Sequence, residues 1–347
     1  MRTFFEIGDV PVTDVGDVLV IPEVGINHNG CLAVAKEMVD AAYRAGAKLV
    51  KHQTHVVDDE MSAAARKVKP GNADMSIYDI MSACALSEED EYELMVYVES
   101  LGMEFLSTPF SRAAADRLEH FGIKAYKVGS GEMNNLPLLA HIASFGKPMI
   151  VSTGMNGLKR VCKAVKVLED YKVPFALLHT TNLYPTDPSL VRLGAMQEMM
   201  GVFPGVPVGL SDHTLTNAAC TAAIALGARI VERHFTDRMD REGPDIVCSM
   251  DETALGELLA AAHDVPLMLG GCKDEIANEQ VTRDFAFASV VAIKGIMAGE
   301  RLTVNNIWVK RPGTGDIPAE YYDEVLGKTA GRDIVEGEQI AWDILEG

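Results

Sequence analysis

The stretches AKLVKHQT (47–54) and RIVERHFT (229–236) decide the fold. Each is a short apolar run that finishes in polar residues, which are Lys51, His52 and Gln53 in the first run and Glu232, Arg233 and His234 in the second. Charged side chains are costly to bury unless they have partners or face a cavity. If both runs are strands of one closed sheet, we expect their polar ends to meet around a single pocket.

Six further runs share this pattern, and the segments between successive runs have apolar residues at the spacing of a helix. They are 18–25, 103–110, 125–132, 148–155, 175–182 and 207–214. Eight alternating β/α units over about 250 residues are typical of a closed (β/α)₈ TIM barrel, which belongs to the α/β class. An open doubly wound sheet is the alternative, but only the strand ends near its switch point would meet. Because all eight runs end in polar residues, we favour the barrel.

The remaining segments predict the domain organisation. We expect residues 3–17 to form a hairpin that closes the barrel floor, and the insertion at 55–87 to lie over the mouth as a lid. The barrel domain is predicted at 1–271, a polar linker at 272–284, and a small β-rich domain at 285–347. That last domain contains a weak repeat at a spacing of 38, AIKGIMAGERL against AGRDIVEGEQI, which indicates pseudo-twofold symmetry.

Composition excludes several classes of protein. The formal net charge of −19 disfavours nucleic acid as a partner, because phosphate backbones would be repelled. No apolar run is long enough for a membrane span, and the first twenty residues lack the layout of a secretion signal. We therefore expect a cytoplasmic enzyme with no membrane partner. The six cysteines are scattered without a CxxC pair, which favours reduced thiols over disulfides or a zinc cluster.

Two histidines are candidate metal ligands. Side chains two apart on a strand share a face, so His213 and His234 should both point into the mouth from neighbouring strands. Together they could hold one exchangeable divalent metal, with Mn²⁺ preferred and Mg²⁺ or Co²⁺ as alternatives. The other interpretation is a pair of imidazoles that are simply hydrogen-bonded in the mouth.

Two lysines and a carboxylate share the same rim. Lys51 and Lys127, with Ser130, Ser152 and Ser211, could cradle a phosphate or a carboxylate. One of the lysines could instead form a Schiff base, as in class I aldolases. Glu23 is a candidate general acid or base, and its alternative role is an ion pair with Lys51.

Six motifs, in order, resemble those of one enzyme family. EVGINHNG, EFLSTPF, YKVGSGE, STGM, SDHT and GPDIVCSM are similar to motifs of the sialic acid synthases, the phosphoenolpyruvate-dependent N-acetylneuraminate synthases. The resemblance covers nearly the whole chain, is strongest to the bacterial branch, and makes the terminal domain an antifreeze-like (SAF) domain.

This resemblance implies a reaction and a set of binding residues. Phosphoenolpyruvate would condense with open-chain N-acetylmannosamine and water to give N-acetylneuraminate and phosphate. His213 and His234 would hold the metal, and Glu23 would manage protons. Phosphoenolpyruvate would be bound by Lys51, Gln53, Lys127, Ser130, Ser152, Asn182 and Ser211.

The resemblance also implies a sugar site and an assembly. The sugar would contact Asn72, Glu132, Tyr184, Glu232, Asp245 and Arg311. In the family the arginine comes from the other subunit of a domain-swapped homodimer. The competing interpretation of Arg311 is a loop residue that forms a salt bridge with Asp316.

Three alternatives to this function stay open. A sister synthase would use the same barrel chemistry on another amino sugar to make legionaminic or pseudaminic acid. A class I aldolase would use free pyruvate and a Schiff-base lysine. A binding protein with an inactive barrel would release no phosphate and would not respond to metal chelation.

Overall fold

The eight expected strands close into one parallel barrel. The computed structural model describes residues 2–69 and 75–347. Its barrel strands are β3 (Leu19–Gly25), β4 (Leu49–Thr54), β5 (Glu104–Pro109), β6 (Tyr126–Val128), β7 (Met149–Ser152), β8 (Phe175–Thr180), β9 (Val208–Asp212) and β10 (Ile230–His234). They follow one another in sequence order around the ring, and β10 pairs with β3 to close it. The predicted TIM barrel is confirmed.

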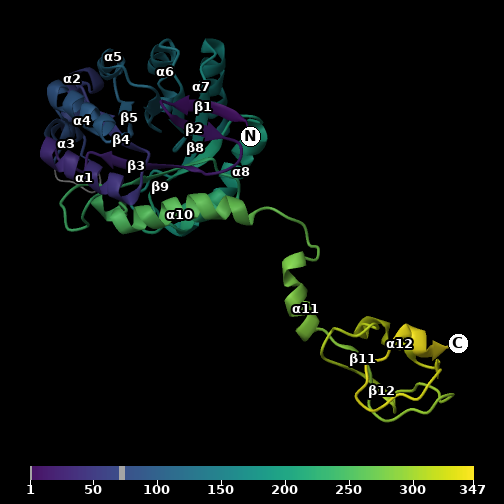
Figure 1. The fold of residues 1–347 in the computed structure, drawn as a ribbon. Helices are drawn as coiled ribbons and strands as arrows, with labels where there is room; N and C mark the ends of the chain where they lie inside the picture. The colour runs from purple at the N-terminus through teal and green to yellow at the C-terminus, as the bar shows by residue number, and fades with distance from the viewer. Residues whose placement is uncertain (1, 70–74) are drawn as a thin grey trace. The chain divides into compact units, whose positions relative to one another are not determined.

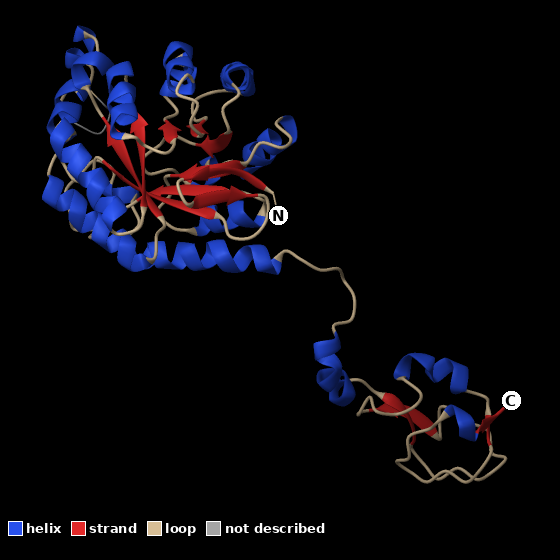
Figure 2. Cartoon of the chain, turned by 45° about the horizontal axis from the view of Figure 1, so that its top comes forward, coloured by secondary structure: helices blue, strands red, loops and turns tan. Residues whose placement is uncertain are grey.

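Helices cover the outside of the barrel, as Figures 1 and 2 show. They are α1 (Leu32–Ala45), α4 (Glu88–Ser100), α5 (Arg112–Phe121), α6 (Leu136–Ala143), α7 (Leu158–Tyr171), α8 (Leu193–Val202), α9 (Ala218–Ala225) and α10 (Glu252–Met268). Local sequence sets their starts: the Ser87 side chain accepts the Asp90 N–H at the first turn of α4, and Ser111 accepts the Ala114 N–H in α5.

Strand alternation divides the buried residues into two layers. Inward-facing residues such as Leu49, Leu106 and Ile150 fill the lower barrel, whereas outward-facing residues such as Val50 and Phe105 pack under the helices. On β4 the inward parity continues from Leu49 to Lys51 and Gln53. The inward-facing residues of β4 therefore change from apolar to polar between Leu49 and Lys51, and the polar ones lie at the carboxyl end of the strand.

The N-terminal hairpin belongs to the inner core. Strands β1 (Thr3–Ile7) and β2 (Val10–Thr13) pair antiparallel, and Phe5, Ile7 and Val12 are buried in the same cluster as the inward barrel residues. The hairpin thus closes the end of the barrel opposite the polar strand ends, as expected for residues 3–17.

The insertion after β4 contains three short helices in its described part. These are α2 (Val57–Glu60), the 3₁₀ helix η1 (Ala63–Lys67) and α3 (Ile77–Cys84). The Tyr78 hydroxyl donates to Asp58 at 2.6 Å, and the Ala113 N–H donates to Asp59 at 2.8 Å. These bonds connect α3 to α2, and α2 to the first turn of α5.

The chain divides into two compact units, the first ending at Gly270 and the second beginning at Gly271. The second unit holds η5 (Ala277–Glu279), α11 (Gln280–Ala286), β11 (Ser289–Ala292), β12 (Ile307–Lys310), η6 (Ala319–Tyr321), α12 (Tyr322–Val325), β13 (Thr329–Ala330), η7 (Trp342–Ile344) and β14 (Leu345–Glu346). The segment expected as a polar linker therefore includes η5 and the first part of α11.

The 38-residue repeat is a structural repeat. Ile296 and Ile334, which lie 38 apart, exchange both backbone hydrogen bonds. The bond from Ala292 N–H to the Glu338 carbonyl has its counterpart from Ala330 N–H to the Glu300 carbonyl. Because each bond maps onto the other by the same spacing, the second unit has the pseudo-twofold symmetry that the sequence predicts.

Within the described residues, the structure contains no helix that is both long and apolar enough to cross a membrane.

Candidate active site

The carboxyl ends of the barrel strands surround a polar cavity of about 170 Å³. The predicted residues that line it are Glu23, Lys51, Gln53, Lys127, Ser130, Glu132, Ser152, Asn182, Tyr184, Ser211, His213, Glu232 and His234. They come from the barrel strands or the turns that follow them. Closure of the barrel therefore brings together residues more than 200 positions apart in sequence.

Lys51 lies between two carboxylates. Its Nζ is 2.5 Å from Glu23 Oε2 and 3.7 Å from Glu232 Oε1, and it donates to the Thr108 hydroxyl at 3.3 Å. Gln53 Nε2 donates to the other Glu23 oxygen at 2.7 Å. The ion pair that was the alternative role for Glu23 is thus formed inside the cavity. Because Glu23 still lines that cavity, the ion pair is compatible with its predicted role as general acid or base.

Glu232 balances the second lysine. Lys127 Nζ is 3.6 Å from Glu232 Oε1, and the Ser211 hydroxyl donates to the same oxygen at 3.3 Å. Burial by itself would raise the pKa of Glu232, but Lys127 and Lys51 outweigh it and the pKa is lowered. Burial lowers the pKa of Lys127, and the charge of Glu232 opposes this effect. Two carboxylates and two amines therefore share one nearly neutral buried cluster.

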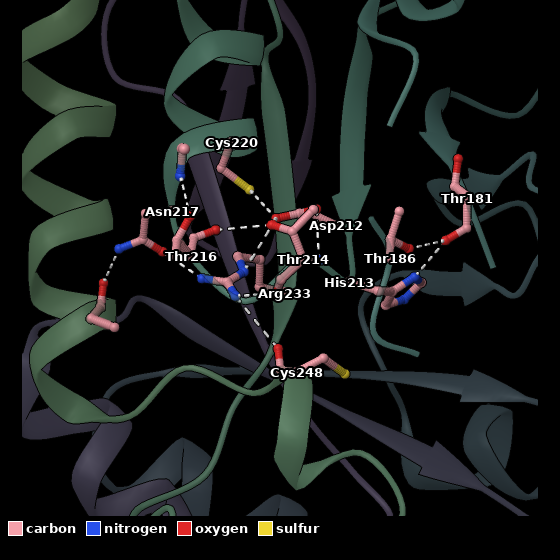
Figure 3. A network of polar contacts seen from close by, with 12 residues as sticks. Thr181, Thr186, Asp212, His213, Thr214, Thr216, Asn217, Cys220, Arg233 and Cys248 are labelled. Atoms are coloured by element: carbon pink, nitrogen blue, oxygen red, sulfur yellow. Dashed lines mark hydrogen bonds and ion pairs between the residues drawn. The ribbon is translucent and has the colours of Figure 1, made fainter. Parts of the chain in front are cut away.

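His213 and His234 are buried neighbours. Their ring centroids are 5.4 Å apart, and the Tyr184 ring is 4.1 Å from that of His213. Burial, and next the neighbouring His234, lower the pKa of His213 to about 4; burial also lowers the pKa of His234 to about 4. Both imidazoles are therefore neutral near pH 7. Figure 3 shows His213 Nδ1 directed at the Thr181 carbonyl, 2.9 Å away, which places the ring proton on Nδ1 and leaves the Nε2 lone pair free.

Several polar atoms that line the cavity lack partners. Ser152 Oγ, Asn182 Oδ1, Glu232 Oε2 and His234 Nδ1 are buried, and none has a hydrogen-bond partner within residues 2–69 and 75–347. Buried polar groups in native proteins are nearly always satisfied. Four such atoms around one cavity indicate that a polar ligand completes the site.

Two residues of the opening stretches do not reach the cavity, so the expectation that all six polar residues meet there was wrong. His52 points out of the barrel toward Glu91 of α4, 3.3 Å away. Figure 3 shows Arg233 on the outer side as well, between Asn217 and the Thr214 and Cys248 carbonyls. The reason is strand alternation: these residues lie one position out of phase with Lys51 and His234.

A second, larger cavity of about 980 Å³ shares some of the same residues. Gln53, Phe110, Tyr184 and His234 line both cavities. Asp245, another predicted sugar contact, lines only the second one, and burial raises its pKa. The remaining wall is largely apolar and includes Ile26, Ile77, Ile80, Met81 and Val247. The insertion helix α3 therefore supplies one wall, as a lid does.

Two predicted sugar contacts are not in this group. Asn72 lies outside the described residues. Arg311 follows β12 in the second unit, where it is exposed. Asp316, its alternative partner, instead accepts the Trp342 N–H at 3.0 Å, and among the described residues no ion pair joins Arg311 to Asp316. Its predicted role toward the sugar stays a prediction.

Two residues of the cavity wall had no predicted role: Thr108, which the sequence placed among the polar strand ends, and Phe110, which it did not single out. Thr108 pairs in register with Gln53 across β4 and β5, and Phe110 lies two residues further along. The alternation rule separates Thr108 from Ser107, because only Thr108 has the same parity as the other inward residues. Phe110 continues the same parity just past the end of β5, but its apolar side chain gave no functional signal.

The fold and the cavity define a class: a (β/α)₈-barrel enzyme whose site lies at the carboxyl ends of the strands. The comparisons with known proteins identify the family. The NeuB family model matches residues 38–274, and a SAF domain model matches residues 287–346. The chain belongs to the NeuB family, the sialic acid synthases, and its terminal unit is a SAF domain.

Individual relatives agree with this family. An uncharacterized protein of Methanocaldococcus jannaschii is 37% identical over 99% of this chain and 98% of its own length. The N,N'-diacetyllegionaminic acid synthase of Legionella pneumophila is 37% identical, and the match covers 94% of each chain. The crystal structure of the sialic acid synthetase of Leptospira borgpetersenii, solved with citrate, is similar with a TM-score of 0.73 and 25% identity, over 80% of this chain and 94% of that one.

Proposed function

We propose that this chain condenses phosphoenolpyruvate with the open-chain form of an N-acylated amino sugar, and that N-acetylmannosamine is its first candidate substrate. Carbon three of phosphoenolpyruvate would attack the sugar aldehyde, water would add at carbon two, and the C–O bond to phosphate would break. The products would be a nine-carbon acid, N-acetylneuraminate for this sugar, and inorganic phosphate. The observation that carries the proposal is the set of unpartnered polar atoms around one cavity with two buried lysines.

The polar cavity suits the phosphate and carboxylate of phosphoenolpyruvate. Lys51 and Lys127 would supply positive charge, and the serine hydroxyls and the Asn182 amide would supply directed hydrogen bonds. The Gly154 N–H already donates to Ser130 Oγ at 3.0 Å, which fixes that hydroxyl in place. Each ammonium group has three donors, so Lys51 and Lys127 can bind an anion that enters here and keep their contacts with Glu23 and Glu232.

Glu23 is the proposed acid–base group. Its carboxylate is 1% exposed and is held by Lys51 on one oxygen and Gln53 on the other. A carboxylate held at both oxygens has a defined direction in which it can accept or return a proton. In the proposed reaction Glu23 would take a proton from the attacking water and return one as phosphate leaves.

The two histidines fit a divalent metal. Both are neutral, the Nε2 lone pair of His213 is free, and His234 Nδ1 has no hydrogen-bond partner among the described residues. No set of three or more His, Cys, Asp or Glu residues in that same part of the chain could hold a metal, which disfavours a closed structural site. We propose that His213 and His234 hold Mn²⁺, with Mg²⁺ or Co²⁺ as alternatives; when bound, the metal would polarise the sugar aldehyde as a Lewis acid.

A specific observation also favours a second candidate sugar. The cavity beside the lysines is large, and its wall is mainly aliphatic. A sugar with two N-acetyl groups, as in the name of the Legionella relative, would bring a second apolar methyl group to that wall. The second candidate is therefore synthesis of N,N'-diacetyllegionaminic acid by the same barrel chemistry.

We also propose that the SAF domain completes the site in a domain-swapped homodimer. Arg311 is an exposed cation at the end of a short strand. It would reach the N-acyl group of a sugar bound to the other subunit. The functional test for this arrangement is complementation between two defective variants.

One experiment tests the proposed reaction. The full chain is incubated with phosphoenolpyruvate, Mn²⁺ and a panel of mono- and diacetylated hexosamines, and released phosphate and nine-carbon acids are measured by mass spectrometry. We expect phosphate release that depends on one of the sugars and stops on metal chelation. Failure of every sugar in the panel to stimulate phosphate release would overturn the proposal. Covalent trapping of pyruvate on Lys51 or Lys127 by borohydride would show an aldolase instead.

A further inference from the structure

A continuous chain of hydrogen bonds leads from the insertion to Glu23. Glu60, the last residue of α2, places Oε2 2.8 Å from His55 Nδ1. His55 Nε2 is 3.2 Å from Gln53 Oε1, and Gln53 Nε2 is 2.7 Å from Glu23 Oε1. The His55 ring is stacked on Phe110, with centroids 4.4 Å apart and planes inclined by 15°. The side chains of His55 and Glu60 are only 2% and 12% exposed, so water competes little for these bonds.

The order of donors and acceptors fixes the protons on His55. An ionised Glu23 can only accept, so the Gln53 amide must direct its NH₂ group at Glu23 and its oxygen at His55. That oxygen also only accepts, so His55 Nε2 carries a proton. The Glu60 carboxylate accepts as well, so His55 Nδ1 carries the second proton. The ring that satisfies every bond is an imidazolium.

We propose that His55, held as a cation between Glu60 and Gln53, is a positioning residue that orients the Gln53 amide and through it the Glu23 carboxylate. The inference rests on the proposed function, in which Glu23 is the acid–base group. It assigns a role to His55 and Glu60, which line neither the polar cavity nor the larger one beside it.

The surroundings support a single cation at this position. The charged or titratable groups that face His55 are Glu60 from α2, Glu132 from the turn after β6, and His28 from the turn after β3. Burial, His52 and also His55 lower the pKa of His28 to about 3, so His28 is neutral and does not add a second charge. The π face of Phe110 further favours a cation in the ring stacked on it.

Loss of the positive charge on His55 would reverse the donor–acceptor order of the hydrogen bonds that lead to Glu23. A neutral His55 would keep its proton on Nδ1, because the Glu60 carboxylate is a stronger acceptor than an amide oxygen. Its Nε2 lone pair would then face the Gln53 oxygen, and the amide would turn over to remove the clash. Glu23 Oε1 would then face an oxygen in place of a donor. The carboxylate would lose its fixed direction, although the phosphoenolpyruvate cradle would stay intact.

Kinetics on His55→Gln and Glu60→Gln test this role. A glutamine at position 55 cannot donate at both ends, so we expect kcat to fall about 10- to 100-fold while KM for phosphoenolpyruvate changes less than about 3-fold. Glu60→Gln should lower kcat less, because the new amide can donate to an unprotonated His55 Nδ1 and leave the Nε2 proton on the bond to Gln53. The matched control is His141→Gln, which removes a partly exposed histidine paired with Asp116 at 2.6 Å and should leave kcat unchanged.

Nitrogen NMR of labelled histidine gives a readout that needs no turnover. We expect one of the nine histidines to show both ring nitrogens protonated at neutral pH, and this signal to change to a neutral ring protonated at Nε2 in Glu60→Gln. A wild-type spectrum in which the signal perturbed by Glu60→Gln is already neutral would overturn the inference, as would a wild-type kcat in His55→Gln. Absence of phosphate release by the wild-type enzyme would instead overturn the proposed reaction. If His55→Gln does not fold, the spectra of wild type and Glu60→Gln still decide.

Discussion

Low pH should destabilise the barrel through protonation of His28, a buried imidazole in the turn that follows β3. His28 is 1% exposed, stacks on His52 with centroids 5.3 Å apart, and accepts the Gly30 N–H on Nδ1 at 3.1 Å. Burial, and then His52, lower the pKa of His28 to about 3 from 6.5. Protonation of Nδ1 would also abolish the bond from Gly30, so the folded state resists the charge.

The direction and size of the effect follow from proton linkage. The folded state binds the proton less tightly than the unfolded chain, so stability is fully present above pH 6.5 and is lost as the pH falls through 6.5 toward 3. The loss would reach about 5 kcal/mol below pH 3, and about 2 kcal/mol of it falls between pH 7 and pH 5.

Urea unfolding of wild type and His28→Gln at pH 7 and pH 5 measures this contribution. The chain has two tryptophans, Trp308 and Trp342, and both lie in the SAF unit, so tryptophan fluorescence reports that unit and far-UV circular dichroism is needed for the barrel. His28→Gln should be less stable than wild type at pH 7, and the difference should shrink by about 2 kcal/mol at pH 5 because the variant has no imidazole to protonate.

The control variant is judged by the same quantity: the change, between pH 7 and pH 5, in its free energy of unfolding relative to wild type. His263→Gln replaces an exposed histidine paired with Asp17 and should keep nearly the same difference from wild type at both pH values. If His28→Gln behaves like that control, the reasoning about His28 is wrong. His28→Asn serves the same purpose if the glutamine does not fit.

Three further predictions concern the site. In Gly154→Ala, the new methyl group would overlap the Asn182 side chain and lie 2.8 Å from Ser130 Oγ. We therefore expect KM for phosphoenolpyruvate to rise about 10-fold or more, with little change in KM for the sugar. Equal changes in the two KM values would contradict this prediction. His213→Ala should abolish turnover with an unchanged circular dichroism spectrum, and full wild-type activity in EDTA would refute the metal role. Arg311→Ala should weaken sugar binding, and its mixture with His213→Ala should regain activity; steady-state assays that show no complementation would count against the domain swap.

The sequence could predict those residues of the candidate site whose inward direction follows from their position along a strand. Lys51, Gln53, Ser211 and His234 were found because inward positions recur every second residue at strand ends. Phe110 and His55 continue the inward parity just past their strands. They were missed because Phe110 is apolar and because residue 55 was assigned to the insertion. On the sugar side only Glu232 follows from strand spacing. The other predicted contacts came from family resemblance, because they lie on turns, in the insertion or in the SAF unit, where no periodicity constrains side-chain direction.

By itself, the sequence determined the barrel, the floor hairpin, the repeat in the second unit and the set of inward polar residues. The barrel and the inward polar residues follow from local periodicity, which each segment carries independently of its neighbours, whereas the repeat follows from the similarity of two segments. Only the tertiary structure decided the partners: Glu23 with Lys51 and Gln53, Glu232 with Lys127, and Glu60 with His55. Closure of the ring sets the register between strands and the distances across the cavity, and hydrogen bonds and ion pairs form only where those distances fall within reach of the side chains.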